Sequence, residues 1–167
     1  MGSAIGMVEL GSIARGIEAC DYMLKAAQVD LLRASTVCPG KYIILVSGDT
    51  GDVRASVAEG IARGGKRVVD TLLLSNVHPQ LIPVIRKTAR VTRRGALGVL
   101  EFRSVASAVT AADTAAKAAD ITLIRVRIGY AIGGKGYVTL TGDVGPVRAA
   151  VTAVIPRPSH RLFDSLL

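Results

Sequence analysis

Aromatic side chains are scarce in this chain of 167 residues, which has no Trp, four Tyr and two Phe. Proteins that bind single-stranded nucleic acid without sequence preference stack the bases on aromatic rings, so this chain is poorly equipped for that function. Cysteine and histidine are also rare, with two residues of each type. Cys20 and Cys38 are too few for a disulfide framework, and neither His78 nor His160 has a companion metal ligand nearby in the sequence.

Long apolar runs and catalytic patterns are missing as well. No uninterrupted apolar segment approaches the roughly 20 residues that cross a bilayer. The first residues lack the basic and apolar regions of a signal peptide, so we expect a cytosolic protein with no membrane partner. The sequence shows no Ser-His-Asp arrangement, paired carboxylates or HExxH motif, so we expect no enzyme. Apolar residues make up 50% of the chain, and we expect part of this apolar surface to lie in subunit interfaces.

Positive charge exceeds negative charge by eight. Much of this excess lies in one segment, from Thr71 to Leu100, which contains no acidic residue. Its basic residues are Arg86, Lys87, Arg90, Arg93 and Arg94. Such a cluster is compatible with nucleic-acid binding. We favour a solvated connector or a surface that faces another subunit, and expect no nucleic-acid partner.

The chain contains an internal repeat. When the sequence is shifted by 92 residues its two halves align, and after a loop the shift becomes 94. The second copy therefore has two extra residues in its loop 129–135. The aligned pairs include Glu9 with Glu101, Lys25 with Lys117, Lys41 with Lys135 and Asp49 with Asp143. This repeat predicts two domains of the same fold.

Each copy begins with a strand, followed by a serine, Ser12 or Ser104, that can cap a helix. The elements predicted for the first copy are strands Ile5–Leu10, Val29–Arg33, Tyr42–Ser47 and Arg67–Leu74 and a second helix Val53–Arg63. Those of the second copy are strands Leu97–Phe102, Ile121–Arg127 and Tyr137–Thr141 and a second helix Pro146–Val154. The order is that of a split βαβ, ferredoxin-like fold. We therefore predict an α/β protein of the α+β kind, with two tandem domains, each a mainly antiparallel sheet with flanking helices.

The first helix of each copy carries apolar residues at helical spacing. In the first copy they are Ile13, Ile17, Cys20, Leu24 and Ala27, and in the second Val105, Val109, Ala112, Ala116 and Ala119. We predict that each set forms one apolar stripe. Cys20 is then a small core residue without a chemical role.

The domain boundaries follow from the repeat. We expect a first domain at residues 1–83, a basic linker at 84–95, a second domain at 96–158 and a C-terminal tail at 159–167. The second copy runs from Val151 to Ile155-Pro156-Arg157-Pro158 with no room for an equivalent of Arg67–Leu74. Either this copy has lost its last strand or those residues are missing from the sequence.

Cys38 lies in the loop Ser35–Lys41, between two predicted strands. Pro39 and Gly40 predict a tight turn, which leaves the thiol near its apex. One thiol cannot hold a metal cluster, but a ring of subunits with this loop on its axis would bring several copies together. The glycine-rich loop 129–137 of the second copy could cradle a phosphate. It lacks Walker spacing and joins two strands, so phosphate binding is not favoured.

Four segments together resemble bacterial microcompartment shell (BMC) domains. They are Ala4–Glu9, Asp21–Ala27, Gly48-Asp49 and Ile155–Pro158. Two such domains in tandem resemble the trimeric shell subunits, and Cys38-Pro39-Gly40-Lys41 resembles the propanediol-utilisation T type. The resemblance covers nearly the whole chain. It implies a shell tile in the bacterial cytoplasm, a pseudo-hexagonal homotrimer that contacts neighbouring tiles.

The same resemblance implies functional residues. In the T type, the cysteine at the position of Cys38 is the protein ligand of one [4Fe–4S] cluster per trimer, which implies electron transfer across the shell with a redox enzyme in the lumen as partner. Lys25 and Lys117 match a position at the tile edge. The implied pore-loop residues are Thr36, Val37, Pro39, Gly40, Lys41, Tyr130, Ala131, Ile132, Gly133 and Gly134. The alternatives are a tile whose metal-free axial pore passes small molecules and, less favoured, a basic nucleic-acid-binding module built on Arg86–Arg94.

Overall fold

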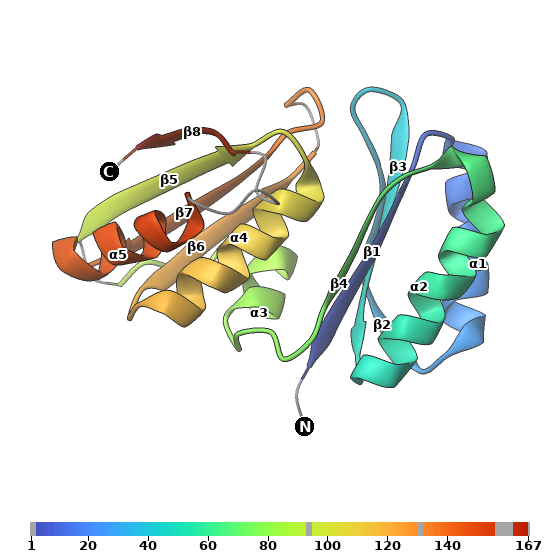
Figure 1. The fold of residues 1–167 in the computed structure, drawn as a ribbon, viewed down its shortest axis with the longest axis horizontal. Helices are drawn as coiled ribbons and strands as arrows, with labels where there is room; N and C mark the ends of the chain where they lie inside the picture. Colours follow the sequence, from blue (N-terminus) through green and yellow to red (C-terminus); the bar gives the residue numbers. More distant parts are fainter. Residues whose placement is uncertain (1–2, 93–94, 130–131, 156–161, 167) are drawn as a thin grey trace. The chain divides into compact units, whose positions relative to one another are not determined.

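Figure 1 shows the computed structural model, which describes residues 3–92, 95–129, 132–155 and 162–166. The chain divides into two units, Met1–Val77 and His78–Leu167. Each unit contains a four-stranded sheet whose neighbouring strands are antiparallel. The predicted α+β fold with two tandem domains is therefore confirmed.

Unit 1 has its strands in the order β2-β3-β1-β4. The two long helices lie on one face of this sheet (Figure 1), and α1 packs against α2. The elements are β1 (Ala4–Leu10), α1 (Ile13–Ala26), β2 (Val29–Val37), β3 (Lys41–Gly48), α2 (Thr50–Gly64), the 3-10 helix η1 (Gly65–Arg67) and β4 (Val68–Leu74). Ala4, Val8, Met23, Ile44 and Val53 are among the core residues.

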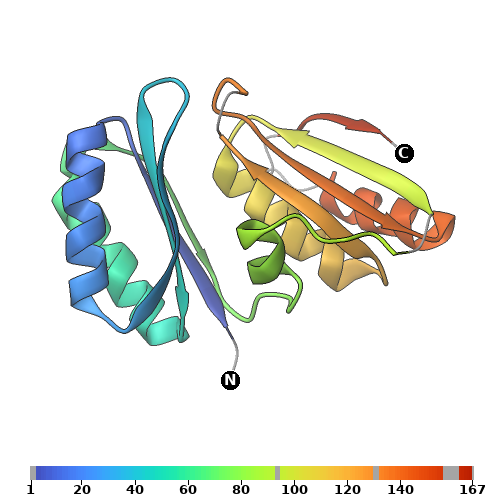
Figure 2. The ribbon, with the colours of Figure 1, turned by 180° about the vertical axis from the view of Figure 1, so that it is seen from behind.

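Unit 2 repeats this arrangement in the order β6-β7-β5-β8. Figure 2 shows α4 and α5 on one face of the sheet. The short helix α3 lies before the first strand of the second copy and packs on β6 and α4. The elements are α3 (Leu81–Arg86), β5 (Ala96–Phe102), α4 (Val105–Ala118), β6 (Thr122–Ile128), β7 (Gly136–Gly142), α5 (Val144–Val154) and β8 (Leu162–Leu166). Within the described ranges, no helix is both long and apolar enough to cross a membrane.

The strand registers of the two units match the sequence repeat. Ala4 pairs with Gly48 in unit 1, and Ala96 pairs with Gly142 in unit 2. Both helices that follow the first strand begin at the predicted serine. Ser12 accepts a hydrogen bond from the Arg15 N–H at 3.4 Å, and Ser104 accepts one from the Ser107 N–H at 3.2 Å.

The residues predicted for the α4 stripe are buried except for Ala119, but ten of the fourteen residues of α4 are buried, so this does not single out one face. The predicted stripe is wrong for most of α1. Val105, Val109, Ala112 and Ala116 of α4 are buried. On α1, however, Ile13, Ile17 and Leu24 are exposed, and the buried residues are Gly16, Ala19, Cys20 and Met23. The reason is the glycine, because a side chain at Gly16 would clash with the Cβ and ring of Tyr42. The face made of small residues therefore packs on the sheet, and Cys20 is a core residue as predicted.

The predicted boundary at residue 83 and the predicted linker at 84–95 differ from the structure. Unit 1 ends at Val77, whose N–H donates to the Ser3 carbonyl at 2.9 Å. The following segment belongs to unit 2, because α3 buries Leu81, Val84 and Ile85. Pro83 does not break α3, since it lies in the first turn, where a helix does not use its N–H groups.

The prediction that the second copy lacks its last strand is wrong. Strand β8 pairs with β5, with Leu166 opposite Val99 and Leu162 opposite Phe102. It occupies the place that β4 holds beside β1 in unit 1. The shift of 94 places Val68 on Leu162 and Asp70 on Asp164, so the repeat does extend to β8. The prediction missed the strand because it followed the repeat only as far as Val151 and assigned the residues after Pro158 to a tail. Residues 156–161 lie outside the described part of the chain.

Candidate functional site

The turn between β2 and β3 has the tight form that its sequence predicts. Cys38, Pro39 and Gly40 make the turn, and Val37 pairs with Lys41 across it. The peptide bond between Cys38 and Pro39 is cis, and Gly40 adopts a φ of 64°, in the left-handed region that favours glycine. Cys38 is partly exposed, in contrast to Cys20, which is buried. The chain thus offers one thiol on a turn and one in its core.

In each unit a lysine is bound to a glutamate on the neighbouring strand. Lys41 is the first residue of β3, and Lys135 directly precedes β7. Lys41 Nζ lies 2.7 Å from Glu9 Oε1 in unit 1, and Lys135 Nζ lies 2.7 Å from Glu101 Oε1 in unit 2. The first pair is well buried, since the Glu9 side chain is 3% exposed, whereas that of Glu101 is 35% exposed. Sequence reasoning missed these ion pairs, although the repeat aligned both the glutamates and the lysines.

The loop between β6 and β7 closes on itself through its own backbone. The Gly129 N–H donates to the Lys135 carbonyl at 3.0 Å, and the Lys135 N–H donates to the Ile132 carbonyl at 3.2 Å. Gly133 and Gly134 have φ values of 64° and 77°, so these positions favour glycine. Tyr130 and Ala131, two of the expected pore-loop residues, lie outside the described part of the chain.

A depression of about 440 Å³ lies beside this loop in unit 2. Ile132 and Lys135 of the loop line it together with Val99, Glu101 and Tyr137 of strands β5 and β7. The depression therefore combines an ion pair with aliphatic and aromatic surface.

The side chains described by the structure include no group of three or more His, Cys, Asp or Glu residues that could hold a metal ion. Among the described residues of one chain, Cys38 is therefore not part of such a group. A cluster bound by cysteine thiolates needs several of them, so any such site must take its other ligands from further copies of the chain. A partly exposed thiol on a turn suits that arrangement, and a core thiol such as Cys20 does not.

The two lysines that match a tile edge have different surroundings. Lys25 Nζ lies 2.6 Å from Asp21 Oδ2 on an exposed part of α1, and this hydrogen bond raises the pKa of Lys25. Lys117 Nζ lies 2.5 Å from Oδ2 of Asp113, which is buried and whose Oδ1 also accepts a hydrogen bond from the His78 N–H at 2.7 Å. Only the lysine of unit 2 is thus tied to a carboxylate with a second structural role. His160 lies outside the described residues.

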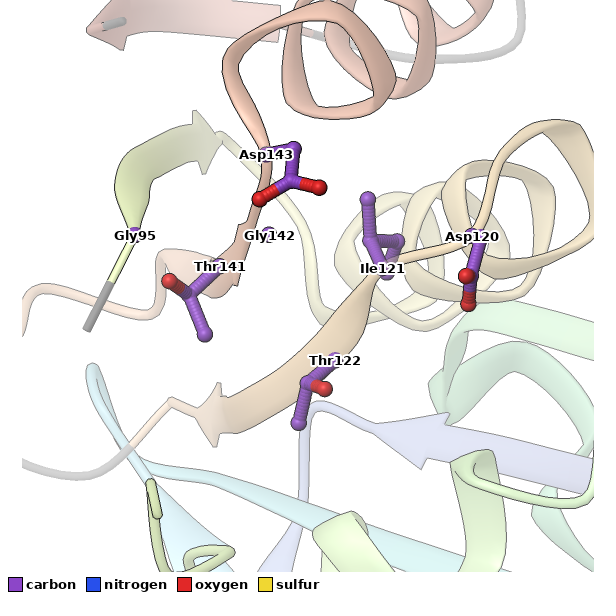
Figure 3. A pocket seen from close by; sticks show the side chains of 7 residues that line it. All are labelled: Gly95, Asp120, Ile121, Thr122, Thr141, Gly142 and Asp143. Carbon is purple, nitrogen blue, oxygen red and sulfur yellow. The ribbon is translucent and has the colours of Figure 1, made fainter. Parts of the chain in front are cut away.

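Figure 3 shows a smaller depression of about 160 Å³ at the end of the unit 2 sheet. Ile121 lies between the carboxylates of Asp120 and Asp143 in this view. The Thr141 hydroxyl at its edge donates to the Ala96 carbonyl at 2.8 Å. Sequence reasoning did not single out this place, and its contacts do not identify a ligand.

The model of the BMC domain family matches residues 4–77 and 96–165, so the chain belongs to this family and carries two of its domains. Over its whole length the chain is similar to the bacterial microcompartment shell protein PduT of Citrobacter freundii. The two are 41% identical over 182 aligned positions, which cover 100% of this chain and 99% of PduT. The family resemblance stated from the sequence is confirmed.

One further relative is similar to about half of this chain, and two solved structures share the fold of nearly all of it. The carboxysome shell protein CsoS1A of Hydrogenovibrio crunogenus is 37% identical over 87 residues, 50% of this chain and 91% of that one. The crystal structure of a microcompartments protein from Desulfitobacterium hafniense DCB is similar with a TM-score of 0.94 and 50% identity, over 99% of this chain and 93% of that one. A fused permuted hexameric shell protein from the RMM microcompartment has a TM-score of 0.63 and 25% identity, over 91% and 81% of the two chains.

Proposed function

We propose that this protein is a structural tile of a bacterial microcompartment shell in the cytoplasm, and that it is not an enzyme. The observation that carries the proposal is the tandem of BMC domains, which together with the connecting segment is similar to PduT from end to end. Three copies, each with two like units, would supply six BMC domains to a pseudo-hexagonal homotrimer. Its edges, with Lys25 and Lys117, would contact neighbouring tiles.

The finer part of the proposal concerns the axis of this trimer. We propose that Cys38 of three copies holds one [4Fe–4S] cluster, surrounded by the pore-loop residues of both units. Thiolate is the usual protein ligand of such clusters. When bound, the cluster would supply one-electron transfer between the two sides of the shell, with a redox enzyme in the lumen as the partner.

The residues around Cys38 support this role by what they do to the loop. The turn at Pro39 and Gly40 presents the thiol at partial exposure, so it can approach thiols of other copies. Lys41 is held by Glu9 on the neighbouring strand, which fixes the base of the loop. A rigid base and an accessible apex limit the conformational freedom that ligands lose when they converge on one site.

Anaerobic reconstitution of the full chain with ferrous iron and sulfide tests the axial site. The expected product is a brown trimer with about four irons for every three chains, as measured by iron and sulfide assays and by light scattering. Cys38→Ala should lose the colour and the iron and remain a trimer. Cys20→Ala is the matched control and should keep both, because Cys20 is a core residue.

The test also separates the proposal from its alternative. A colourless, iron-free trimer from wild-type protein would favour the tile with a metal-free axial opening for small molecules. A protein that remains a monomer under all these conditions would contradict the tile itself. The two outcomes are distinguishable because assembly and iron content are measured on the same sample.

A further inference from the structure

The ion pair between Lys41 and Glu9 lies next to the turn that carries Cys38. Lys41 is the first residue of β3 and pairs across the turn with Val37, the residue before Cys38. No basic residue is closer to Cys38 in the sequence. Lys41 Nζ lies 2.7 Å from Glu9 Oε1, and the side chains of the two residues are 28% and 3% exposed. Water and salt therefore screen this pair far less than a pair on the surface.

Glu9 decides where the ammonium group of Lys41 lies. Strand β3 has β2 on one side and β1, which carries Glu9, on the other, as Figure 1 shows. Glu9 stands opposite Ile43, which is two positions further from the turn than Lys41. The ion pair therefore holds the ammonium group against β1, on the side of β3 that faces away from β2. Without Glu9, the flexible stem of the lysine is free to swing the charge toward Cys38.

The pair also cancels the charge of Lys41. An iron–sulfur cluster becomes more negative by one charge when it takes up an electron, so a positive charge nearby favours the reduced form and raises the reduction potential. In a trimer each charge beside the axis occurs three times around one cluster. Three unpaired lysines would therefore act together on the potential, whereas three lysine–glutamate pairs have no net charge.

We propose that Glu9 is a positioning residue for the axial site: it holds Lys41 back and neutralises it, and so keeps the reduction potential of the cluster lower than a free lysine would. The inference rests on the proposed cluster at Cys38 and assigns a role to a residue outside the loop. Unit 2 has the equivalent pair, Lys135 with Glu101, but its loop contains no cysteine and the Glu101 side chain is 35% exposed. The pair of unit 2 should therefore influence the potential less.

A redox titration of the reconstituted full-length trimer, with dithionite as the reductant and ferricyanide as the oxidant, measures the potential. Glu9→Gln nearly keeps the shape of the side chain and removes its charge, so it should favour the reduced cluster by about tenfold or more, which is about 59 mV for a one-electron couple. Adding Lys41→Gln removes the unpaired charge and should return the potential to that of the wild type. Glu101→Gln should raise the potential by less than Glu9→Gln does.

The double variant separates the effect of charge from a loss of structure. If Glu9→Gln raised the potential only because a loosened loop let water reach the cluster, adding Lys41→Gln would not restore it. The matched control is Glu59→Gln, which makes the same substitution in an ion pair of α2, where Glu59 Oε1 lies 2.7 Å from Arg63 Nε. This pair includes no residue of the turn, so the control should leave the potential unchanged. Circular dichroism verifies that every variant is folded.

Iron content and oligomeric state are measured on every sample, so the inference and the proposed cluster can fail separately. Equal potentials of the wild type and Glu9→Gln at equal iron content would overturn the role of Glu9 and leave the cluster in place. A raised potential that persists in the double variant, or a folded Glu9→Gln trimer that binds no iron, would also overturn it, because Glu9 would then act on the structure of the site. A wild-type trimer without iron would overturn the cluster and this inference together.

Discussion

Units 1 and 2 share one topology, but residues at equivalent positions of their first helices differ in exposure. On α1 the outer apolar residues are open, with Ile17 56% exposed, whereas Val109 of α4 is 0% exposed. The segment after unit 1 also contacts α4, where the His78 N–H donates to Asp113, and α3 packs mainly on β6. Unit 2 also has a short helix, α3, on strand β6, and the described part of unit 1 has no equivalent of it.

This difference shows how a repeated domain can acquire distinct surfaces without a change of fold. Unit 2 uses α3 to cover part of β6, while the outer face of α1 in unit 1 exposes Ile13, Ile17 and Leu24. Apolar patches of this kind are typical of proteins that assemble, which agrees with the proposed tile. The comparison also makes the contribution of each unit testable by paired substitutions.

The largest expected effect comes from a substitution in α3, the short helix that packs on β6 in unit 2. Leu81 of α3 is fully buried, so Leu81→Ala should lower the free energy of unfolding by about 4 kcal/mol, through lost burial and the cavity left behind. Leu24→Ala on the outer face of α1, where Leu24 is 38% exposed, should cost less than about 1 kcal/mol. Denaturant unfolding measures both, and equal losses would contradict the assigned role of α3.

The two lysine–glutamate pairs should differ in their contribution to the free energy of unfolding almost as much as Leu81 and Leu24 do. Lys41→Ala leaves the buried Glu9 carboxylate without its partner and should cost on the order of 3 kcal/mol. Lys135→Ala should cost less than about 1 kcal/mol, because water screens the more exposed pair. Unfolding midpoints measure the difference. Adding Glu9→Gln to Lys41→Ala should recover part of the loss, and a double variant as unstable as the single one would argue against a buried-charge effect.

In each unit a helix and a strand approach closely at a glycine, but the glycine lies on a different element in the two units. In unit 1 the glycine is on the helix, with Gly16 against Tyr42, and in unit 2 it is on the strand, where a Cβ at Gly136 would lie 2.6 Å from the Ala108 Cβ. Helix propensity favours alanine over glycine by about 1 kcal/mol. In Gly16→Ala the clash of the new Cβ with the Tyr42 Cβ should outweigh this gain. The net loss in the free energy of unfolding should be about 2 kcal/mol.

Thermal unfolding tests this packing. Gly136→Ala should also destabilise the protein, and adding Ala108→Gly should recover part of that loss, because the two sites share one contact. Gly51→Ala is the control, since nothing lies near that position, and it should be neutral or slightly stabilising. A loss at Gly51 as large as that at Gly16 would rule out the clash as the cause.

The smallest effect concerns pH. Burial, followed by the nearby charge of Asp21, raises the pKa of the Cys20 thiol above its ordinary value of 9.0. Because the pKa is raised in the folded protein, this contribution to stability is complete below about pH 9 and is lost as the pH rises through the folded pKa. Cys20→Ala, which copies Ala112 of unit 2, should reduce the alkaline loss of stability by less than about 1 kcal/mol at pH 10. The remaining loss includes a contribution from Tyr42, because burial also raises the pKa of its hydroxyl. An unchanged alkaline slope would contradict the assignment to Cys20.

The repeat made most of the fold predictable. Glu9 aligned with Glu101 and Ser12 with Ser104, and the structure places both pairs at equivalent points of equivalent elements. The turn at Pro39 and Gly40 was predictable for a local reason, since proline and glycine restrict or permit particular backbone angles. The roles of Cys38, Lys25 and Lys117 remain predictions from the resemblance.

The features that sequence reasoning missed depend on contacts between distant residues. The buried face of α1 could not be chosen from periodicity, because Ile13 and Ile17 are more apolar than Gly16 and only the nearness of Tyr42 decides between the two faces. Gln80 binds the edge of β6 more than 40 positions further along the chain, and nothing local to Gln80 indicates this. Strand β8 is a different case, because the shift of 94 places Val68 on Leu162 and the repeat itself therefore indicates the strand.

The reversed placement of glycine bears on how two like modules avoid exchanging parts while they fold. If α4 docked on β3, Ala108 would meet the Tyr42 ring, and if α1 docked on β7, Gly16 would face Gly136 and leave a void. Each helix therefore fits its own sheet better than that of its sibling. A tandem chain of near-duplicates is exposed to swapped intermediates, and one pair of complementary residue sizes gives it a means of discriminating against them.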